Sequence, residues 1–171
     1  MTRTTIYLDV DGVLNAVSGR APGKRFVGWE EYREVHVKGF RIHYAPALIN
    51  ALNKLAARDD VTFKWLTTWK HEAAGKLSAA IGLNGQDWEV LDGDLHAWGG
   101  GAWWKLTAIR NDLNGRSIWI DDDISAEPVA TDWAGQRDEL LLVSPSVGHG
   151  LTTQHLETIT AYLDAEQEVA A

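Results

Sequence analysis

The sequence predicts a three-layer, Rossmann-like α/β domain with a mostly parallel, five-stranded central sheet. Three observations favour this fold: five short apolar runs have strand character, segments with helical spacing separate most of them, and polar residues cluster where the runs end. Strands separated by helices imply right-handed crossovers, a sheet covered on both faces, and a ligand crevice beyond the carboxyl ends of the strands. The 171 residues suit one domain, residues 1–171.

The first half of the chain begins this alternation. A strand is expected at Ile6–Val10, which is rich in β-branched and apolar residues. Residues 16–44 form an insert, and its alternating part, RFVGWEEYREVHVKGFRIHY, indicates a β-hairpin or flap instead of a helical cap domain. A helix is expected at Pro46–Arg58 and the second strand at Val61–Leu66. With only a flap over it, the site is expected to be open.

The second half continues the pattern. KHEAAGKLSAAIG predicts a helix closed by Gly82, and the third strand is expected at Trp88–Leu91. WWKLTAIRNDL predicts the next helix, RSIWID the fourth strand and ELLLVS the fifth. A last helix is expected to begin near Thr152, with residues 165–171 fraying beyond it.

Composition excludes several classes of protein. The net charge of −8, from 16 basic and 24 acidic residues, argues against broad electrostatic capture of nucleic acid or an anionic membrane, although a local basic patch stays open. The absence of cysteine excludes disulfides, thiolate zinc sites and cysteine nucleophiles. The first apolar run is too short for a signal peptide and no run is long enough for a bilayer, so a cytoplasmic location is expected. No obligate protein partner is indicated.

Polar residues follow four of the predicted strands. They are Asp9 and Asp11 after the first, Thr67 and Thr68 after the second, Lys105 after the third, and Asp121, Asp122 and Asp123 after the fourth. The carboxyl ends of parallel strands meet at one edge of a sheet, so these side chains can line one crevice. Taken singly, each has an ordinary reading as turn, helix-cap or solvated residue. Only their combination favours catalysis, and the repulsion between Asp9 and Asp11 predicts a cation or reactive group between them.

This order of motifs resembles the haloacid dehalogenase (HAD) superfamily, whose members are mostly phosphatases and phosphotransferases that work through an aspartyl-phosphate. DVDGV matches the first motif, LTT the second, Lys105 the third and IDDD the fourth, so the resemblance spans nearly the whole chain. DVDGVLN, WLTTW and GHGLT resemble more narrowly the compact HAD domains of phages and actinobacteria that are associated with RNA-end repair. The resemblance implies a HAD-type fold and phosphatase chemistry.

The resemblance also implies a magnesium ion at the sheet edge. Its ligands would be the Asp9 side chain, the Asp11 backbone carbonyl and a carboxylate from Asp122 or Asp121. One or two carboxylates, together with water and substrate phosphate, are the ligands that Mg²⁺ usually takes in proteins. The ion would offset the repulsion between the acids.

Catalytic roles follow from the same resemblance. Asp9 would attack phosphorus, and Asp11 would protonate the leaving oxygen and then activate water. Thr67 would hydrogen-bond a phosphoryl oxygen and Lys105 would supply positive charge where transition-state charge accumulates. Gly12 lets the chain turn tightly enough for backbone N–H groups to approach the phosphate.

Aromatic residues give an indication of the substrate in addition to the resemblance to RNA-end repair domains. Nine tryptophans are many for this length, and exposed rings beside a phosphate site could stack on a nucleobase. Trp65 and Trp119, within strands, are assigned to the core. The residues predicted to contact substrate are Gly12, Thr68, Trp98, Trp103, Trp104 and His149.

Three functions are open at this point. The leading one is a magnesium-dependent phosphatase for a terminal phosphate on a nucleotide, RNA or DNA. The second is a phosphatase for a small metabolite, with the tryptophans purely structural. The third is a catalytically idle module that binds a phosphorylated ligand or a partner. The presence of both Asp9 and Asp11 argues against the idle module.

Overall fold

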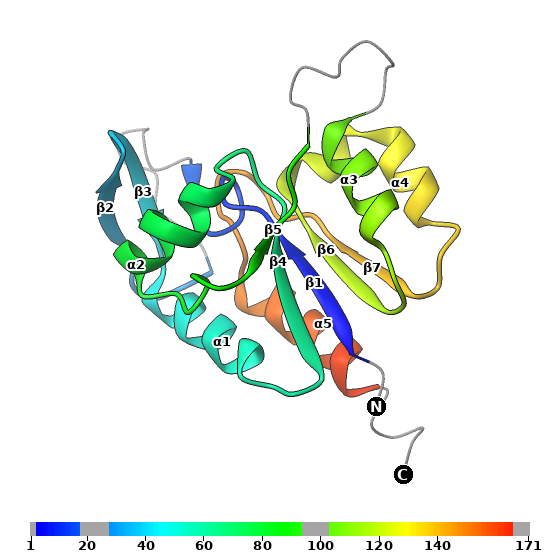
Figure 1. The fold of residues 1–171 in the computed structure, drawn as a ribbon. Coiled ribbons are helices and arrows are strands. Elements are labelled where there is room, and N and C mark those ends of the chain that lie inside the picture. The colour runs from blue at the N-terminus through cyan, green and yellow to red at the C-terminus, as the bar shows by residue number, and fades with distance from the viewer. Residues whose placement is uncertain (1–2, 18–27, 94–102, 166–171) are drawn as a thin grey trace.

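A five-stranded parallel sheet forms the centre of the computed structural model, which describes residues 3–17, 28–93 and 103–165 (Figure 1). The strand order is β5-β4-β1-β6-β7, and every neighbouring pair is parallel. The strands are β1 (Thr4–Leu8), β4 (Val61–Trp65), β5 (Glu89–Val90), β6 (Ser117–Ile120) and β7 (Leu140–Val143). The predicted α/β fold class with a five-stranded parallel sheet is confirmed.

Strand register brings the ends of the central strands level. In the sheet Leu8 lies opposite Trp65 on one side and Ile120 on the other, so β1, β4 and β6 finish together. β1 ends two residues before the predicted boundary because the chain turns at Val10, whose carbonyl accepts hydrogen bonds from three following amides. The strand order also reverses at β1, and ligands bind at such switch points in open α/β sheets.

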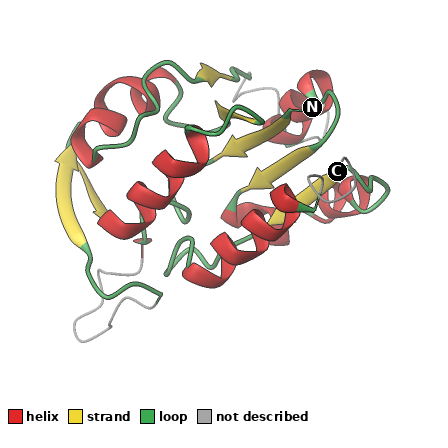
Figure 2. Cartoon of the chain, turned by 90° about the horizontal axis from the view of Figure 1, so that it is seen from below, coloured by secondary structure: helices red, strands yellow, loops and turns green. Residues whose placement is uncertain are grey.

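Helices cover both faces of the sheet (Figures 1 and 2). They are α1 (Pro46–Ala56) and α5 (Thr153–Asp164) on one face, and α3 (Trp104–Asp112) and α4 (Pro128–Ala134) on the other. Side chains alternate along β1, so that Ile6 and Leu8 join the hydrophobic cluster under α1 and α5, whereas Tyr7 joins the cluster under α3 and α4. The two clusters bury the sheet between the helical layers.

The segment predicted as one helix before Gly82 is divided in two. A π-helical turn, η2 (Ala73–Leu77), leads into the short helix α2 (Ser78–Ile81), and Gly82 closes it with a φ of 77°. The fully buried Ser78 donates both its backbone N–H and, at 2.7 Å, its hydroxyl to the Ala73 carbonyl, so this carbonyl has two partners inside the wider turn. Two elements between the fourth and fifth strands, η4 (Asp122–Ala126) and α4, are additions to the prediction, because that stretch has little apolar periodicity.

The predicted hairpin is present in residues 16–44. It consists of β2 (Arg33–Val37) and β3 (Phe40–Tyr44), which pair antiparallel, while residues 18–27 lie outside the described part. Lys38 and Gly39 form its two-residue turn with φ of 52° and 82°, the positive values that a type I′ turn requires. In Figure 1 the hairpin lies beside α2, on the side of the sheet opposite β7. The predicted fraying concerns residues beyond Ala165 that also lie outside the described part.

Candidate metal and catalytic site

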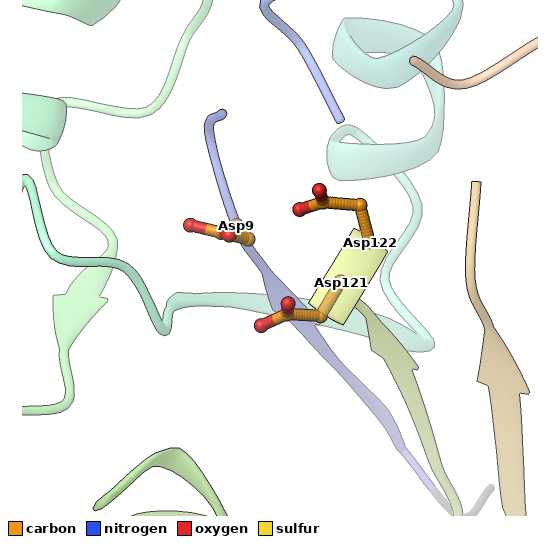
Figure 3. A group of neighbouring side chains, drawn as sticks. All are labelled: Asp9, Asp121 and Asp122. Carbon is orange, nitrogen blue, oxygen red and sulfur yellow. The ribbon is translucent and has the colours of Figure 1, made fainter. Parts of the chain in front are cut away.

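Three carboxylates meet at the carboxyl ends of two neighbouring strands. Asp9 directly follows β1, and Asp121 and Asp122 directly follow β6 (Figure 3). Carboxylate oxygens from all three lie within 4.8 Å of one another. Asp9 is 4% exposed and Asp121 is fully buried, whereas Asp122 is half-buried and borders an open cavity. The parallel pairing of β1 and β6 therefore creates an acidic group at the switch point of the sheet.

Lys105 is the cation within this group. It is the second residue of α3, it is buried, and its Nζ lies 2.8 Å from Asp9 Oδ2 and 2.7 Å from Asp121 Oδ2. Burial by itself lowers the pKa of the Lys105 ammonium, but the charges of Asp9 and Asp121 outweigh it and hold the pKa above its usual range. One ammonium against three carboxylates leaves two negative charges uncompensated when all the acids are ionised.

Burial raises the pKa values of all three acids, and neighbouring carboxylates add to the effect at Asp121 and Asp122. Burial raises the pKa of Asp9, although Lys105 and the Thr67 hydroxyl favour its charged form. Burial and then the charge of Asp9 raise the pKa of Asp121 to about 8. Burial and then the charge of Asp123 raise the pKa of Asp122 to about 6. A divalent cation would balance these charges, and the oxygen donors are of the kind that hard cations take, so the residues fit such an ion.

Asp11 stands apart from the three clustered acids. Its Oδ1 accepts a hydrogen bond from Asn15 Nδ2 at 2.7 Å, and its Oδ2 accepts one from Trp69 Nε1 at 2.8 Å. Asn15 in turn accepts a hydrogen bond from the backbone N–H of His43 in β3, which connects the loop after β1 to the hairpin. From the sequence no role was assigned to Asn15 or Trp69, although Asn15 lies within the motif DVDGVLN and Trp69 within WLTTW.

Gly12 is required by the position of Asp122. Its φ is +69°, and a Cβ added there would lie 2.2 Å from Asp122 Cγ. Its N–H donates to the Asn15 carbonyl at 2.9 Å. The expectation that Gly12 permits a tight turn agrees with this φ, but its own N–H is committed inside the turn. The glycine makes room for a carboxylate of the acidic group.

The two threonines after β4 face different surroundings. Thr67 is fully buried, its hydroxyl favours the charged form of Asp9, and its Oγ1 accepts a hydrogen bond from the Trp69 N–H at 3.3 Å. Thr68 is exposed and borders the cavity. In this conformation it is Thr68 that borders the cavity, although the sequence assigned it the lesser role. The buried Thr67 stabilises the charged form of Asp9 through its hydroxyl.

An open cavity of about 370 Å³ lies over the acidic group. Its walls combine residues of the strand ends with residues of the hairpin and of the loop after β7. They are Asp9, Asp11, Asn15, Val17, Phe40, Arg41, Thr68, Lys105, Asp122, Asp123 and Val147. This volume is at the lower end of the range for small-molecule sites, and it accommodates a phosphate with part of the group that carries it.

Trp103 and Trp104, which the sequence predicted to contact substrate, do not line this cavity. The Trp103 ring stacks on Trp119 at a centroid distance of 5.2 Å, and Trp104 packs so closely on Gly93 that a Cβ there would lie 2.5 Å from its ring. Both tryptophans pack against the hydrophobic cluster under α3 and α4. Among the described residues, neither they nor His149 lines the cavity. Trp98 lies outside the described residues.

Comparison with known proteins identifies the family. A family model described as "HAD domain in Swiss Army Knife RNA repair proteins" matches residues 5–156. The chain belongs to this HAD family. Comparisons with curated proteins and with solved structures gave no match.

The match contains the complete acidic group, from Asp9 to Asp122, and Lys105 between them. Membership of this family supports a hydrolase of the HAD phosphatase type. HAD domains generally use a divalent metal, and the acidic group Asp9, Asp121 and Asp122 fits that requirement. No helix in the described ranges has both the length and the apolar character to cross a membrane.

Proposed function

We propose that this HAD domain is a magnesium-dependent phosphatase that acts through an aspartyl-phosphate on Asp9. Its substrate would be the terminal phosphate of a nucleotide or of a nucleic acid. One observation carries the proposal: Asp9, Asp121 and Asp122 form a buried acidic group with Lys105, and this group opens into a cavity that Asp11 also lines.

Asp9 and Asp122 are the proposed carboxylate ligands of Mg²⁺, because both border the cavity. Asp121 is engaged with Lys105 Nζ and accepts the Asp123 N–H at 3.1 Å, so its main role is to hold Lys105 toward Asp9. The ion would supply positive charge that neutralises the acids and polarises the substrate phosphate.

The first chemical step uses Asp9 and Asp11. A carboxylate oxygen of Asp9 forms a bond to phosphorus as the bond from phosphorus to the ester oxygen breaks, and Asp11 gives its proton to that leaving oxygen. In the second step Asp11 takes a proton from water, the water oxygen bonds to phosphorus, and the bond to Asp9 breaks, releasing phosphate. Lys105 contributes positive charge beside Asp9 in both steps.

The RNA-repair family and the open cavity support a substrate larger than a free metabolite. Arg41 from the hairpin lines the same cavity. Its Nε lies 3.5 Å from Glu34 Oε1, and its remaining guanidinium N–H groups could contact a second phosphate of such a substrate. A small-metabolite phosphatase is the second candidate. It is favoured by the packing of Trp103 and Trp104 against the hydrophobic cluster, because neither ring lines the cavity where a base would stack.

A panel of phosphorylated compounds tests the proposal. Purified protein should release phosphate from nucleotides and from oligonucleotides with a terminal phosphate when Mg²⁺ is present, and it should lose this activity in a chelator. The matched control is Asp9→Asn, which nearly keeps the shape of the side chain and removes the nucleophile. Equal phosphate release by the wild type and this variant would reject the covalent mechanism. Faster release from sugar phosphates than from any nucleotide would favour the small-metabolite alternative.

A further inference from the structure

A second cavity continues the first one toward the hairpin. Its volume is about 360 Å³, and it shares Asp11, Phe40 and Thr68 with the cavity over the acidic group. Its remaining walls are Lys38, Trp69 and Glu72. The two cavities therefore form one groove that leads from the reacting acids to the tip of the hairpin.

Phe40 is the exposed aromatic residue of this groove. It is 61% exposed, the most exposed large hydrophobic side chain in the described part of the chain, and it lines both cavities. Its ring meets Trp69 edge-to-face at a centroid distance of 5.5 Å and an interplanar angle of 64°. An edge-on contact to one partner leaves much of the ring open, and an open ring face suits a stacked planar ligand.

Several contacts fix this ring relative to the reacting residues. Lys38 in the hairpin turn has a φ of 52°, and its Nζ pairs with Glu72 at 2.7 Å, which ties the tip of the hairpin to the segment before η2. Trp69 contacts Phe40 with its ring and donates its Nε1–H to Asp11. Phe40 is therefore joined to Asp11 through one side chain, and such preorganisation lowers the entropic cost of binding.

Charge limits what the second cavity accepts. Asp11 and Glu72 bring two carboxylates and Lys38 one ammonium, and the ammonium is already paired with Glu72. Additional phosphate groups would meet net negative charge there, whereas a neutral planar ring would not. The scissile phosphate would lie in the first cavity, over the acidic group, and the planar ring of the ligand would lie in the second.

We propose that the second cavity is a nucleobase subsite, in which the base of the nucleotide that carries the scissile phosphate stacks on Phe40. This inference rests on the proposed phosphatase function and specifies its substrate. Phe40 replaces the tryptophans near Lys105 as the aromatic platform, because Trp103 and Trp104 pack against the hydrophobic cluster and line neither cavity, while Phe40 lines both.

Paired substrates test the subsite. Short oligoribonucleotides with a 5′ or a 3′ terminal phosphate are compared with the same oligonucleotides lacking the terminal base, so that the reacting phosphate is unchanged. Wild type should prefer the base-containing member, measured as the ratio of the two KM values. Phe40→Ala should reduce that preference about tenfold, the scale of one base–aromatic stack. Phe40→Tyr should keep it, and Phe40→Leu, which keeps apolar area without a π-face, should lose most of it.

The control is Val129→Ala, which truncates another exposed apolar residue, 57% exposed on α4 and remote from both cavities, and should keep the preference. If Phe40→Ala retains the full preference while phosphate release continues, the subsite is wrong and the phosphatase proposal stands. If wild type releases phosphate from neither substrate, the phosphatase proposal fails.

In that case, calorimetric binding of the paired oligonucleotides to wild type and to Phe40→Ala decides the subsite. If both proteins bind the base-containing oligonucleotide with equal affinity, the subsite is wrong. If Phe40→Ala loses affinity only for the oligonucleotide that carries the terminal base, the subsite is supported.

Discussion

Asp9 has an unfavourable position for a charged residue, since its carboxylate is almost fully buried beside a second buried acid. We expect Asp9→Asn to abolish phosphate release, because an amide is a poor nucleophile. The same change should leave the melting temperature of the metal-free protein equal or higher, because burial raises the pKa of Asp9 and its ionisation therefore opposes folding at neutral pH. Phosphate release and thermal unfolding in a chelator measure the two effects. A marked fall in melting temperature would assign Asp9 a structural role instead.

Trp69 holds the carboxylate that the proposed mechanism uses as acid and base. Trp69→Phe keeps an aromatic ring and removes the Nε1–H that Asp11 Oδ2 accepts at 2.8 Å. We expect kcat to fall, and to fall most for substrates with poor leaving groups, because these depend most on a correctly placed proton donor. Release rates across phosphate esters of graded leaving-group pKa give the measurement.

Asp11→Asn should show the same dependence on the leaving group in a stronger form, and it serves as the reference for Trp69→Phe. A uniform loss in Trp69→Phe, independent of the leaving group, would place the effect in folding or binding and not in proton transfer.

At the scale of single elements, the beginning of α5 contains a titratable cap. His155, three residues after the N-cap Thr152, accepts the Thr152 backbone N–H on its Nδ1 at 3.0 Å, the place that Glu or Gln takes in a capping box. Burial lowers the pKa of His155, so the unfolded chain binds the proton at a higher pH than the folded protein does. The contribution of His155 to stability is therefore fully present above the ordinary pKa of histidine, and it is lost as the pH falls from that value through the lower pKa of the folded protein.

His155→Gln keeps an acceptor at this position and removes the titration. Between about pH 7.5 and pH 5 we expect the melting temperature of wild type to fall further than that of the variant. Comparing the two proteins cancels the titration of the acidic group, which both retain. Parallel melting curves over this range would show that His155 does not sense pH in the folded protein.

For the molecule as a whole, we expect metal binding and folding to be coupled. Three clustered acids with one lysine cost free energy when they ionise in the fold, so a cation that binds only the folded state should raise the melting temperature. We expect millimolar Mg²⁺ to stabilise wild type and to have little effect on Asp9→Asn. Differential scanning calorimetry across a Mg²⁺ titration measures the shift.

The same titration separates the two acids after β6. Asp122→Asn should need more Mg²⁺ for the same rise in melting temperature, because Asp122 borders the cavity where the ion would bind. Asp121→Asn should change the required Mg²⁺ concentration less, because Asp121 is paired with Lys105. If Asp121→Asn needs more Mg²⁺ than Asp122→Asn does, Asp121 is the ligand.

The packing of the molecule also decided which aromatic residues face the site. Trp103 and Trp104 are close to Lys105 in the sequence. The Trp103 ring stacks on Trp119 and its centroid lies 5.4 Å from Lys105 Nζ, and Trp104 packs against Gly93, but neither ring lines the cavity. Phe40 is far from Lys105 in the sequence and reaches the cavity because the hairpin lies beside the segment before η2. Closeness in sequence to a site residue therefore does not show that a side chain lines the cavity, because side-chain orientation depends on the local backbone conformation and on packing against neighbouring residues.

By itself the sequence determined that the strands form a mostly parallel sheet and that the polar residues meet at one edge of it, whereas the strand order came from the structure. Periodic apolar runs identify strands and helices, and the rule that parallel strands end at a common edge places Asp9, Lys105 and Asp121 together. Only the tertiary structure decided that Thr68 faces the cavity while Thr67 is buried, and that Asn15 and Trp69 hold Asp11. The physical reason is that the orientation of a loop side chain depends on contacts between segments distant in sequence, which local pattern and propensity do not contain.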